Sequence, residues 1–409
     1  MKALWNGYVA GPLFGAIWTF IMVVVTCIVV SFSTGEGLAP SLWGSLALGA
    51  WLGFVWLPDG GRKRNERVLW NVVLAILPIA IFLLGKLAIR GAEGTSMTTQ
   101  VIAWLVFAAA SVWPLIRILE GLPFGRTTRH EFEASAIRFL TGFGYIFFTG
   151  IVAIPFYVMV MTSLKNQAEL MANPLDFTID LSKGFDLFRS YNELFTDFNF
   201  GSYLWTSFYV SVLTVILTLA FSIPGAYAVA RLRFKGRAAF SRSILLIYMV
   251  PMIVLALPIY IVFSMAGLRN TIFGIVLIYP VTTIPVALYM LQGYFRGLPA
   301  EVEEAGLMDG LNRLQVIWKI TLPLALPALA SVSLYVFMIA WNEFLLAFML
   351  LDDPSKFTLT RGIASLNSSE IPRQHLMAGA VIATVPIMVL FLGLERFMTK
   401  GLTAGSVKG

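Results

Sequence analysis

The sequence has little charge and almost no metal-binding or redox chemistry. Only 12% of its 409 residues are Asp, Glu, Lys or Arg, about half the share that soluble globular domains carry. A single cysteine, Cys27, excludes an internal disulfide and an all-cysteine metal site. The two histidines, His130 and His375, lie too far apart in the sequence to favour a metal cage. The GxxxxGK[ST] phosphate loop is also missing, so the sequence does not predict an ATPase.

Long apolar runs take up most of the chain. Hydrophobic residues make up 58% of the sequence, and the mean hydropathy is +0.82. A membrane-spanning helix needs about 20 predominantly apolar residues, whereas barrel strands are shorter and alternate in polarity. The sequence therefore predicts an all-α polytopic membrane protein with about ten transmembrane helices, at residues 8–32, 38–57, 69–88, 99–119, 139–161, 203–228, 244–265, 272–294, 324–351 and 376–398.

The positive charge follows the loops between these runs. The net charge is +7, which in a soluble protein would point to nucleic acid. Here most of the Lys and Arg residues fall in alternate short loops, as in 62–67 and 231–242. Basic residues concentrate in cytoplasmic loops. We therefore expect a lipid bilayer rather than a nucleic acid as the partner, with both termini in the cytoplasm.

The spacing of the spans divides the chain into two parts. Residues 1–120 hold four closely spaced spans, and residues 121–138 form a basic, polar segment that we interpret as a cytoplasmic linker. Residues 139–409 hold the other six spans and one long external loop, about 162–201. The sequence thus predicts a four-helix membrane module followed by a six-helix core.

The loop at 297–323 is the most informative stretch. Pro299 and the acidic residues after it suit the start of a helix. Gly310 can adopt the left-handed conformation that ends a helix, and Asn312 with Gln315 resembles a capping pair that opens a second one. The second helix would end at Pro323. Its four apolar or partly apolar residues on one face would be Leu314, Ile317, Trp318 and Thr321. On these grounds alone, an amphipathic connector lying on the membrane is an equally good interpretation.

The order and spacing of residues in this loop carry a family resemblance. The sequence places three short motifs at fixed intervals: Glu304-Ala305-Gly306, Asp309-Gly310-Leu311 and Ile320-Thr321-Leu322-Pro323. This arrangement resembles the EAA signature of binding-protein-dependent ABC importer permeases. It departs from the family pattern at Gly306 and Leu311, where alanine is usual.

The resemblance covers about residues 139–409. It is closest to the second permease subunit of maltose-type carbohydrate importers, whose segments are similar to 227–237, 341–344 and 401–409. The first four spans fall outside the resemblance. The resemblance implies an ABC permease core in the inner membrane, with a transport role and no enzymatic one.

The resemblance also implies a mechanism and a set of partners. The EAA helix would dock on a cytoplasmic ATPase dimer that binds the ATP and Mg, with Glu304 as a charge-assisted contact. This chain would itself hold no cofactor. A second homologous permease would form the other half of the path, and a periplasmic or extracellular sugar-binding protein would deliver the substrate. Similarity to the maltose type points to a di- or oligosaccharide such as an α-glucoside.

Four residues are weaker candidates for the sugar path. Glu343 is an acid well inside a predicted core span, and intramembrane acids usually face a cavity or a partner. With Trp341, Asn342 and Tyr279 it could offer an aromatic face and hydrogen bonds to a sugar. A structural hydrogen bond between helices explains Glu343 at least as well.

Two other classes of protein remain as alternatives. An ion-coupled secondary transporter typically has several buried carboxylates and inverted repeats. This sequence has one acid in a core span and shows no clear repeat. A membrane-embedded enzyme would need a polar catalytic cluster at one depth, and the sequence shows none. The permease interpretation therefore explains the most residues.

Overall fold

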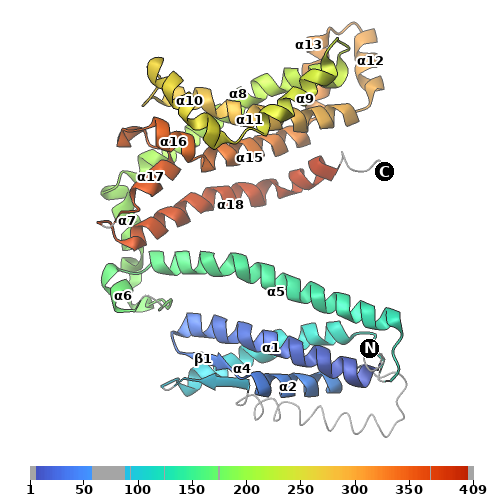
Figure 1. Cartoon of the computed structure of the whole chain (residues 1–409), viewed down its shortest axis with the longest axis vertical. Coiled ribbons are helices and arrows are strands. Elements are labelled where there is room, and N and C mark those ends of the chain that lie inside the picture. The colour runs from blue at the N-terminus through green and yellow to red at the C-terminus, as the bar shows by residue number, and fades with distance from the viewer. Residues whose placement is uncertain are drawn as a thin grey trace. The chain divides into compact units, whose positions relative to one another are not determined.

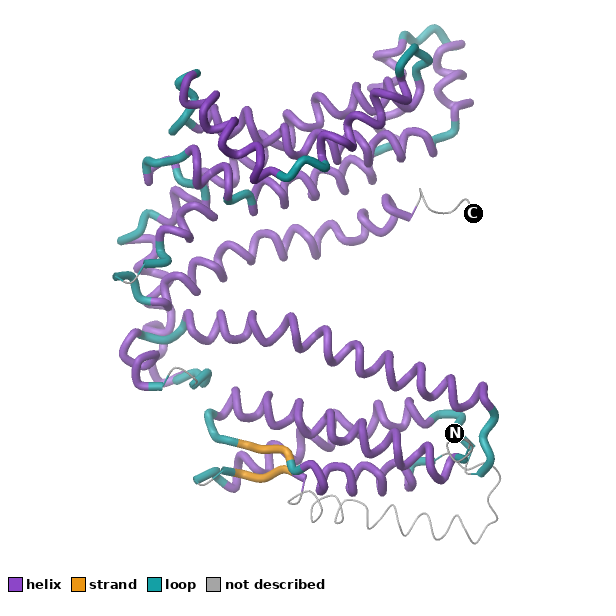
Figure 2. The backbone as a smooth tube through the Cα atoms, in the orientation of Figure 1, coloured by secondary structure: helices purple, strands orange, loops and turns teal. Residues whose placement is uncertain are grey.

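The computed structural model describes residues 6–57, 88–92, 94–123, 125–173, 176–368 and 370–403. The chain forms two compact units, Met1–Leu187 and Phe188–Gly409. Helices dominate both units (Figure 1). The predicted all-α polytopic membrane fold is confirmed, with one addition. A two-stranded antiparallel ribbon pairs β1 (Leu38–Pro40) with β2 (Ile89–Gly91) (Figure 2).

The first unit is built on α1 (Gly7–Thr34). This helix packs against α2 (Leu42–Val55) and α4 (Met97–Leu119) (Figure 1). The unit also contains the long helix α5 (Arg129–Ser163) and the short helix α6 (Gln167–Ala172). A 3₁₀ helix, η2 (Leu181–Phe188), lies at the boundary between the units.

Glycines bring α1 and α2 into backbone contact. A Cβ on Gly15 would lie 2.2 Å from the carbonyl oxygen of Gly49, and a Cβ on Gly53 would lie 2.1 Å from that of Gly11. Both helices therefore carry a glycine pair four residues apart at the crossing. Small residues at this spacing let membrane helices approach closely and gain van der Waals contact.

Aromatic side chains seat the beginning of α5 on α1. The Phe14 ring lies 5.6 Å from that of Phe132 and 5.7 Å from that of Phe139. Trp18 meets Phe139 edge-on and donates a hydrogen bond from Nε1 to the carbonyl oxygen of Ser111 in α4 (3.3 Å). A buried indole usually finds such a partner, and the bond fixes the ring against both neighbours.

The second unit is a bundle around α8 (Phe200–Arg231) and α11 (Ile272–Gly297). These two helices pack along their length, and the hydroxyls of Thr218 and Thr283 meet at 2.7 Å between them. Next to them lies α15 (Leu326–Asn342), which also packs on α18 (Arg373–Thr403). Outside the loop at 297–323, the remaining helices of this unit are short: α7 (Arg189–Thr196), α9 (Arg237–Tyr248), α10 (Met252–Met265), α16 (Leu345–Leu350), η4 (Pro354–Lys356) and α17 (Leu359–Ser365).

Six predicted spans are confirmed as helices long and apolar enough to cross a membrane. They are α1, α4, α5, α8, α11 and the described, apolar part of α18. The predicted span 69–88 lies almost wholly outside the described residues. The other three spans differ from the prediction.

The predicted span 38–57 begins as a strand and continues as the 14 residues of α2. At 1.5 Å per residue α2 is about 21 Å long, shorter than the hydrocarbon core of a bilayer. The prediction of a single helix over 244–265 is wrong. The helix is interrupted between Tyr248 and Met252, where Pro251 cannot donate a backbone hydrogen bond. The predicted span 324–351 also breaks, because Glu343 adopts an extended conformation between α15 and α16.

The predicted linker 121–138 is only partly a linker. Thr128 and Glu131 form a capping box, and the helix α5 begins at Arg129. Such a box satisfies two backbone N–H groups that a helix start leaves unpaired. Residues 129–138 are therefore the first turns of α5. The functional division into 1–120 and 139–409 stays a prediction, whereas the contacts divide the chain between Leu187 and Phe188.

Candidate functional site

The loop at 297–323 folds as two helical segments joined by a tight turn. The first is α12 (Ala300–Met308), and the second runs through α13 (Arg313–Val316), the π-helical η3 (Ile317–Thr321) and α14 (Leu322–Leu324). The second segment and α15 meet at a bend of 80°. The predicted pair of short helices is thus confirmed.

The turn between them has the predicted chemistry. Gly310 has a φ of 85°, and the N–H of Leu311 donates to the carbonyl oxygen of Gly306 at 3.1 Å. A residue with a positive φ ends many helices in this way, and glycine adopts it without a steric penalty. Asn312 and Gln315 form a reciprocal capping box with both hydrogen bonds at 2.9 Å. The turn is therefore fixed by local interactions on both sides.

A buried acid that the sequence analysis missed anchors the loop to the bundle. The side chain of Glu303 in α12 accepts hydrogen bonds from Tyr227 Oη at 3.2 Å and Thr321 Oγ1 at 3.1 Å. Arg231 Nε, at the end of α8, lies 3.3 Å from Glu303 Oε1. The same guanidinium donates from Nη2 to the carbonyl oxygen of Leu298 at 2.7 Å.

This arrangement gives the loop a rigid base. Glu303 is 4% exposed, and a buried carboxylate is tolerated only when it is paired and hydrogen-bonded. Through it, three segments share one polar network: α8, α12 and η3. Its signal in the sequence was an acid three residues before Gly306, on the same face of α12, together with the basic end of the helix at 227–231.

Gly306 marks the closest approach of the two helical segments. A Cβ at this position would lie 2.4 Å from Cδ1 of Ile320, with Leu311 and Val316 also within 4 Å. The glycine therefore makes room for the Ile320 and Leu311 side chains. The two departures from the family pattern, Gly306 and Leu311, lie against each other in the structure and offset each other in volume.

The predicted motif residues divide between the inner and outer surfaces of the loop. Gly306 is buried, and Leu311, Ile320 and Leu322 are half-buried against the bundle. The other five predicted coupling residues are exposed: Glu304, Ala305, Asp309, Gly310 and Pro323. The exposed motif residues are therefore acidic or small, apart from Pro323.

Two details of the second segment differ from the prediction. Leu314 and Trp318 are 70% and 71% exposed, whereas Thr321 is buried beside Glu303, so the four residues predicted to share one face have different surroundings. Val316 takes the inner position instead. Pro323 does not end the helix, because it stands in the first turn of α14, where the missing N–H is tolerated. The helix ends at Leu324.

Three of the four weaker candidates for a sugar path, Trp341, Glu343 and Asn342, form hydrogen bonds to the backbone. Trp341 is buried and donates from Nε1 to the carbonyl oxygen of Ala383 at 3.1 Å. The Glu343 carboxylate accepts from the backbone N–H groups of Leu346 and Ala347 and so caps α16. Tyr279 lies in the same buried cluster as Trp341.

Asn342 is exposed and donates from Nδ2 to the carbonyl oxygen of Met338 at 2.9 Å. The structure thus brings Tyr279 and Trp341 together in a packed core, and it gives Glu343 and Asn342 backbone partners. Contact of these four residues with a substrate stays a prediction.

Comparison with known proteins finds relatives for about two thirds of the chain. Residues 222–403 match the family of binding-protein-dependent transport system inner membrane components. The chain is 37% identical over 274 residues to the inner membrane ABC transporter permease protein YcjP of Escherichia coli, covering 65% of this chain and 95% of that protein. It is 32% identical over 277 residues to the trehalose/maltose transport system permease protein MalG of Thermococcus litoralis, covering 66% and 97%.

A solved structure agrees with these relatives. A chain of a bacterial ABC transporter that imports the acidic polysaccharide alginate superimposes with a TM-score of 0.53 at 25% sequence identity. The match covers 63% of this chain and 96% of that one. Because the chain covers these relatives almost completely and residues 222–403 match the family, the chain belongs to the binding-protein-dependent inner membrane components and is a carbohydrate ABC importer permease.

Proposed function

We propose that this permease forms half of a sugar translocation path and couples it, through the loop 297–323, to a cytoplasmic ATPase dimer. The observation that supports the proposal most is the division of the loop into a fixed base and a free outer surface. Glu303 anchors the base to α8, while Glu304 and Met308 point outward, with Met308 87% exposed. A rigid element of this kind can turn a movement of a partner into a tilt of the helices.

The proposed partners supply the functions that this chain does not. ATP and Mg are bound by the ATPase subunits, since this sequence has no phosphate loop. A second homologous permease completes the path, and a sugar-binding protein outside the membrane delivers the substrate. Nucleotide binding biases a two-state equilibrium between inward-facing and outward-facing arrangements.

The substrate class is a di- or oligosaccharide such as an α-glucoside. The support is the name of one relative, a trehalose/maltose permease; both sugars are α-linked glucose disaccharides. Other relatives of similar identity are named for diacetylchitobiose and for arabinooligosaccharides. The test measures uptake of labelled trehalose or maltose while each of the other sugars is added unlabelled. The sugar that inhibits this uptake most strongly identifies the substrate class.

The test of coupling uses two variants and one matched control. Glu304→Lys reverses a charge on the outer surface, and Gly310→Pro removes the left-handed turn. Like charges facing each other across an interface cost several kcal/mol, so we expect sugar uptake to fall by roughly tenfold or more. Glu301→Lys changes an equally exposed acid of α12 outside the motif and should leave uptake near that of the wild type. Normal uptake by the first two variants, at equal amounts in the membrane, would contradict the proposal.

A further inference from the structure

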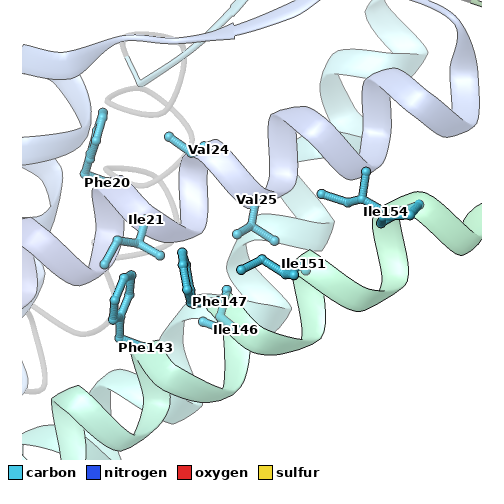
Figure 3. Close-up of a pocket in the computed structure, with 11 residues that line it drawn as sticks. Phe20, Ile21, Val24, Val25, Phe143, Ile146, Phe147, Ile151 and Ile154 are labelled. Atoms are coloured by element: carbon cyan, nitrogen blue, oxygen red, sulfur yellow. The ribbon is translucent and has the colours of Figure 1, made fainter. Parts of the chain in front are cut away.

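The helices α1 and α5 touch at two levels and separate between them. Near their beginnings, Trp18 and Phe139 are in ring contact. Near their ends, the Phe32 and Tyr157 rings stack at 5.8 Å, and Tyr157 Oη donates to the carbonyl oxygen of Phe32 at 3.0 Å. Between these contacts lies a groove of about 530 Å³ (Figure 3).

The groove is lined by hydrocarbon. Ile21 and Val25 of α1 face Phe147, Ile151 and Ile154 of α5 across it (Figure 3). Its volume would hold more than ten water molecules at about 30 Å³ each, yet an ordered water needs two to four polar partners. The lining residues supply no polar side chain. Water is therefore not a stable occupant.

The position of the groove decides which apolar occupant is available. It lies midway along two helices of 28 and 35 residues, which places it within the hydrocarbon core of a bilayer. Among the residues that the structure describes, none covers the apolar span of α5, so within the first unit the groove is open on one side. The two ring contacts hold α1 and α5 together at both ends of the groove, and a flexible acyl chain can fill the space between them without separating the helices.

Charge at one end of α5 identifies the head group. Arg129 is paired with Glu133, but the exposed Arg138 donates only to a backbone oxygen, that of Glu120, among the contacts that the structure describes. Arg138 stands five residues before Phe143, the first lining residue of α5, or about 7.5 Å along the helix. The positive-inside pattern assigns this end to the cytoplasmic leaflet, where anionic lipids attract basic side chains.

We propose that the groove between α1 and α5 binds one acyl chain of an anionic phospholipid, with its head group beside Arg138. The lipid fills a gap that the protein leaves open and completes the packing of α5 on the preceding helices. The first spans of the chain would then form, with α5, a lipid-binding site in addition to their contacts with one another.

The experiment uses the intact importer in nanodiscs and a photoreactive phosphatidylglycerol with a diazirine in the middle of one acyl chain. After illumination and digestion, mass spectrometry maps the adducts. We expect adducts concentrated on the groove-facing residues of α1 and α5. The ratio of phosphatidylglycerol labelling to phosphatidylcholine labelling should be about fivefold lower in Arg138→Gln than in the wild type. The reason is that one basic residue near the membrane surface contributes about 1 kcal/mol to the binding of an anionic lipid.

Two neighbouring residues give a matched pair of variants. Ile151 lines the groove and is 55% exposed, and Val152 is 58% exposed but does not line it. Ile151→Trp should fill the groove and abolish its labelling, whereas Val152→Trp should leave it unchanged. Native mass spectrometry of the unmodified importer should also retain one phosphatidylglycerol.

Two results would overturn the proposal. Labelling in proportion to exposure along α5, with equal yields from both lipids, would mean ordinary contact with bulk lipid. Protection of the groove from lipid, combined with cross-links from α5 to the second permease, would mean that a protein helix covers it.

Discussion

Arg231 and Glu303 lie 72 residues apart in the sequence, and their side chains meet at 3.3 Å at the junction of α8 and α12. Their side chains are 13% and 6% exposed, so water screens the pair weakly. Arg231 also holds the carbonyl oxygen of Leu298, directly before α12. A short polar connection therefore ties the loop at 297–323 to α8.

Removing one member of this pair should damage the loop more than removing both. Glu303→Ala leaves Arg231 without its carboxylate, and breaking a buried pair in this way costs about 3–5 kcal/mol. We expect a lower thermal unfolding temperature and a loss of uptake. Adding Arg231→Leu to Glu303→Ala should recover part of the stability but not the uptake. Additive losses in a double-mutant cycle would show that the two residues act independently.

Gly306 should accept a methyl group but not a branched side chain. The Cβ of Gly306→Ala would clash only with the flexible end of Ile320, which can rotate away, and would lie at ordinary contact distance from Leu311 and Val316. Gly306→Val places two more carbons between α12 and η3, and overpacking of this kind costs about 1–3 kcal/mol. Uptake assays and unfolding of the purified importer check both variants. Rescue of Gly306→Val by Ile320→Ala would confirm the steric cause.

Adding a side chain to a glycine at the crossing of α1 and α2 should destabilise the protein more than adding one to a glycine elsewhere. Gly49→Val would place its Cβ 2.3 Å from the carbonyl oxygen of Gly15, and backbone cannot rotate away as a side chain can. We expect the first unit to unfold at a lower temperature and to become sensitive to protease. Gly144→Val is the matched control, because a Cβ there meets nothing within 4 Å. Equal effects of both variants would contradict close backbone packing.

Acid should loosen the loop that follows α5. Burial raises the pKa of Asp176, but hydrogen bonds from Lys165 and Thr178 outweigh this effect and lower the pKa from 3.8 to about 2. A carboxyl group with a lowered pKa stabilises the fold above its unfolded pKa and loses that contribution as pH falls through the folded value.

Protection of this loop from hydrogen exchange should therefore decrease between about pH 4 and pH 2. Asp176→Asn should already show the lower protection at neutral pH and change little with acid. Asp180→Asn, in the same loop, serves as the control, since the Asp180 side chain accepts hydrogen bonds from the described residues only through Ser182, two positions later. An unchanged acid profile in Asp176→Asn would assign the effect to another group.

The parts of the site that could be predicted from the sequence are those fixed by neighbouring residues. The Gly310 turn and the Asn312–Gln315 capping box depend on residues at most a few positions apart. Glu303 was missed because its partners Tyr227 and Arg231 are supplied by a helix more than 70 residues earlier. Only tertiary packing distinguishes Glu303 from its exposed neighbours Glu301 and Glu304.

The errors in the spans have a related cause. Composition identifies an apolar run, but it does not show where the run breaks. Glu343 interrupts the predicted span 324–351 because its carboxylate caps α16. Helical spacing likewise placed Leu314 and Trp318 on one face with Thr321, whereas the structure exposes the first two and buries Thr321. An exposed apolar residue is informative only once its surroundings are known.

The most direct test of the account is to purify the tagged chain from its native membrane and to identify the proteins that accompany it. The account predicts recovery of an ATPase, a second permease of the same family and a sugar-binding protein, whose bound sugar then identifies the substrate. Recovery of the chain alone, together with sugar uptake driven by an ion gradient after reconstitution, would contradict coupling to an ATPase.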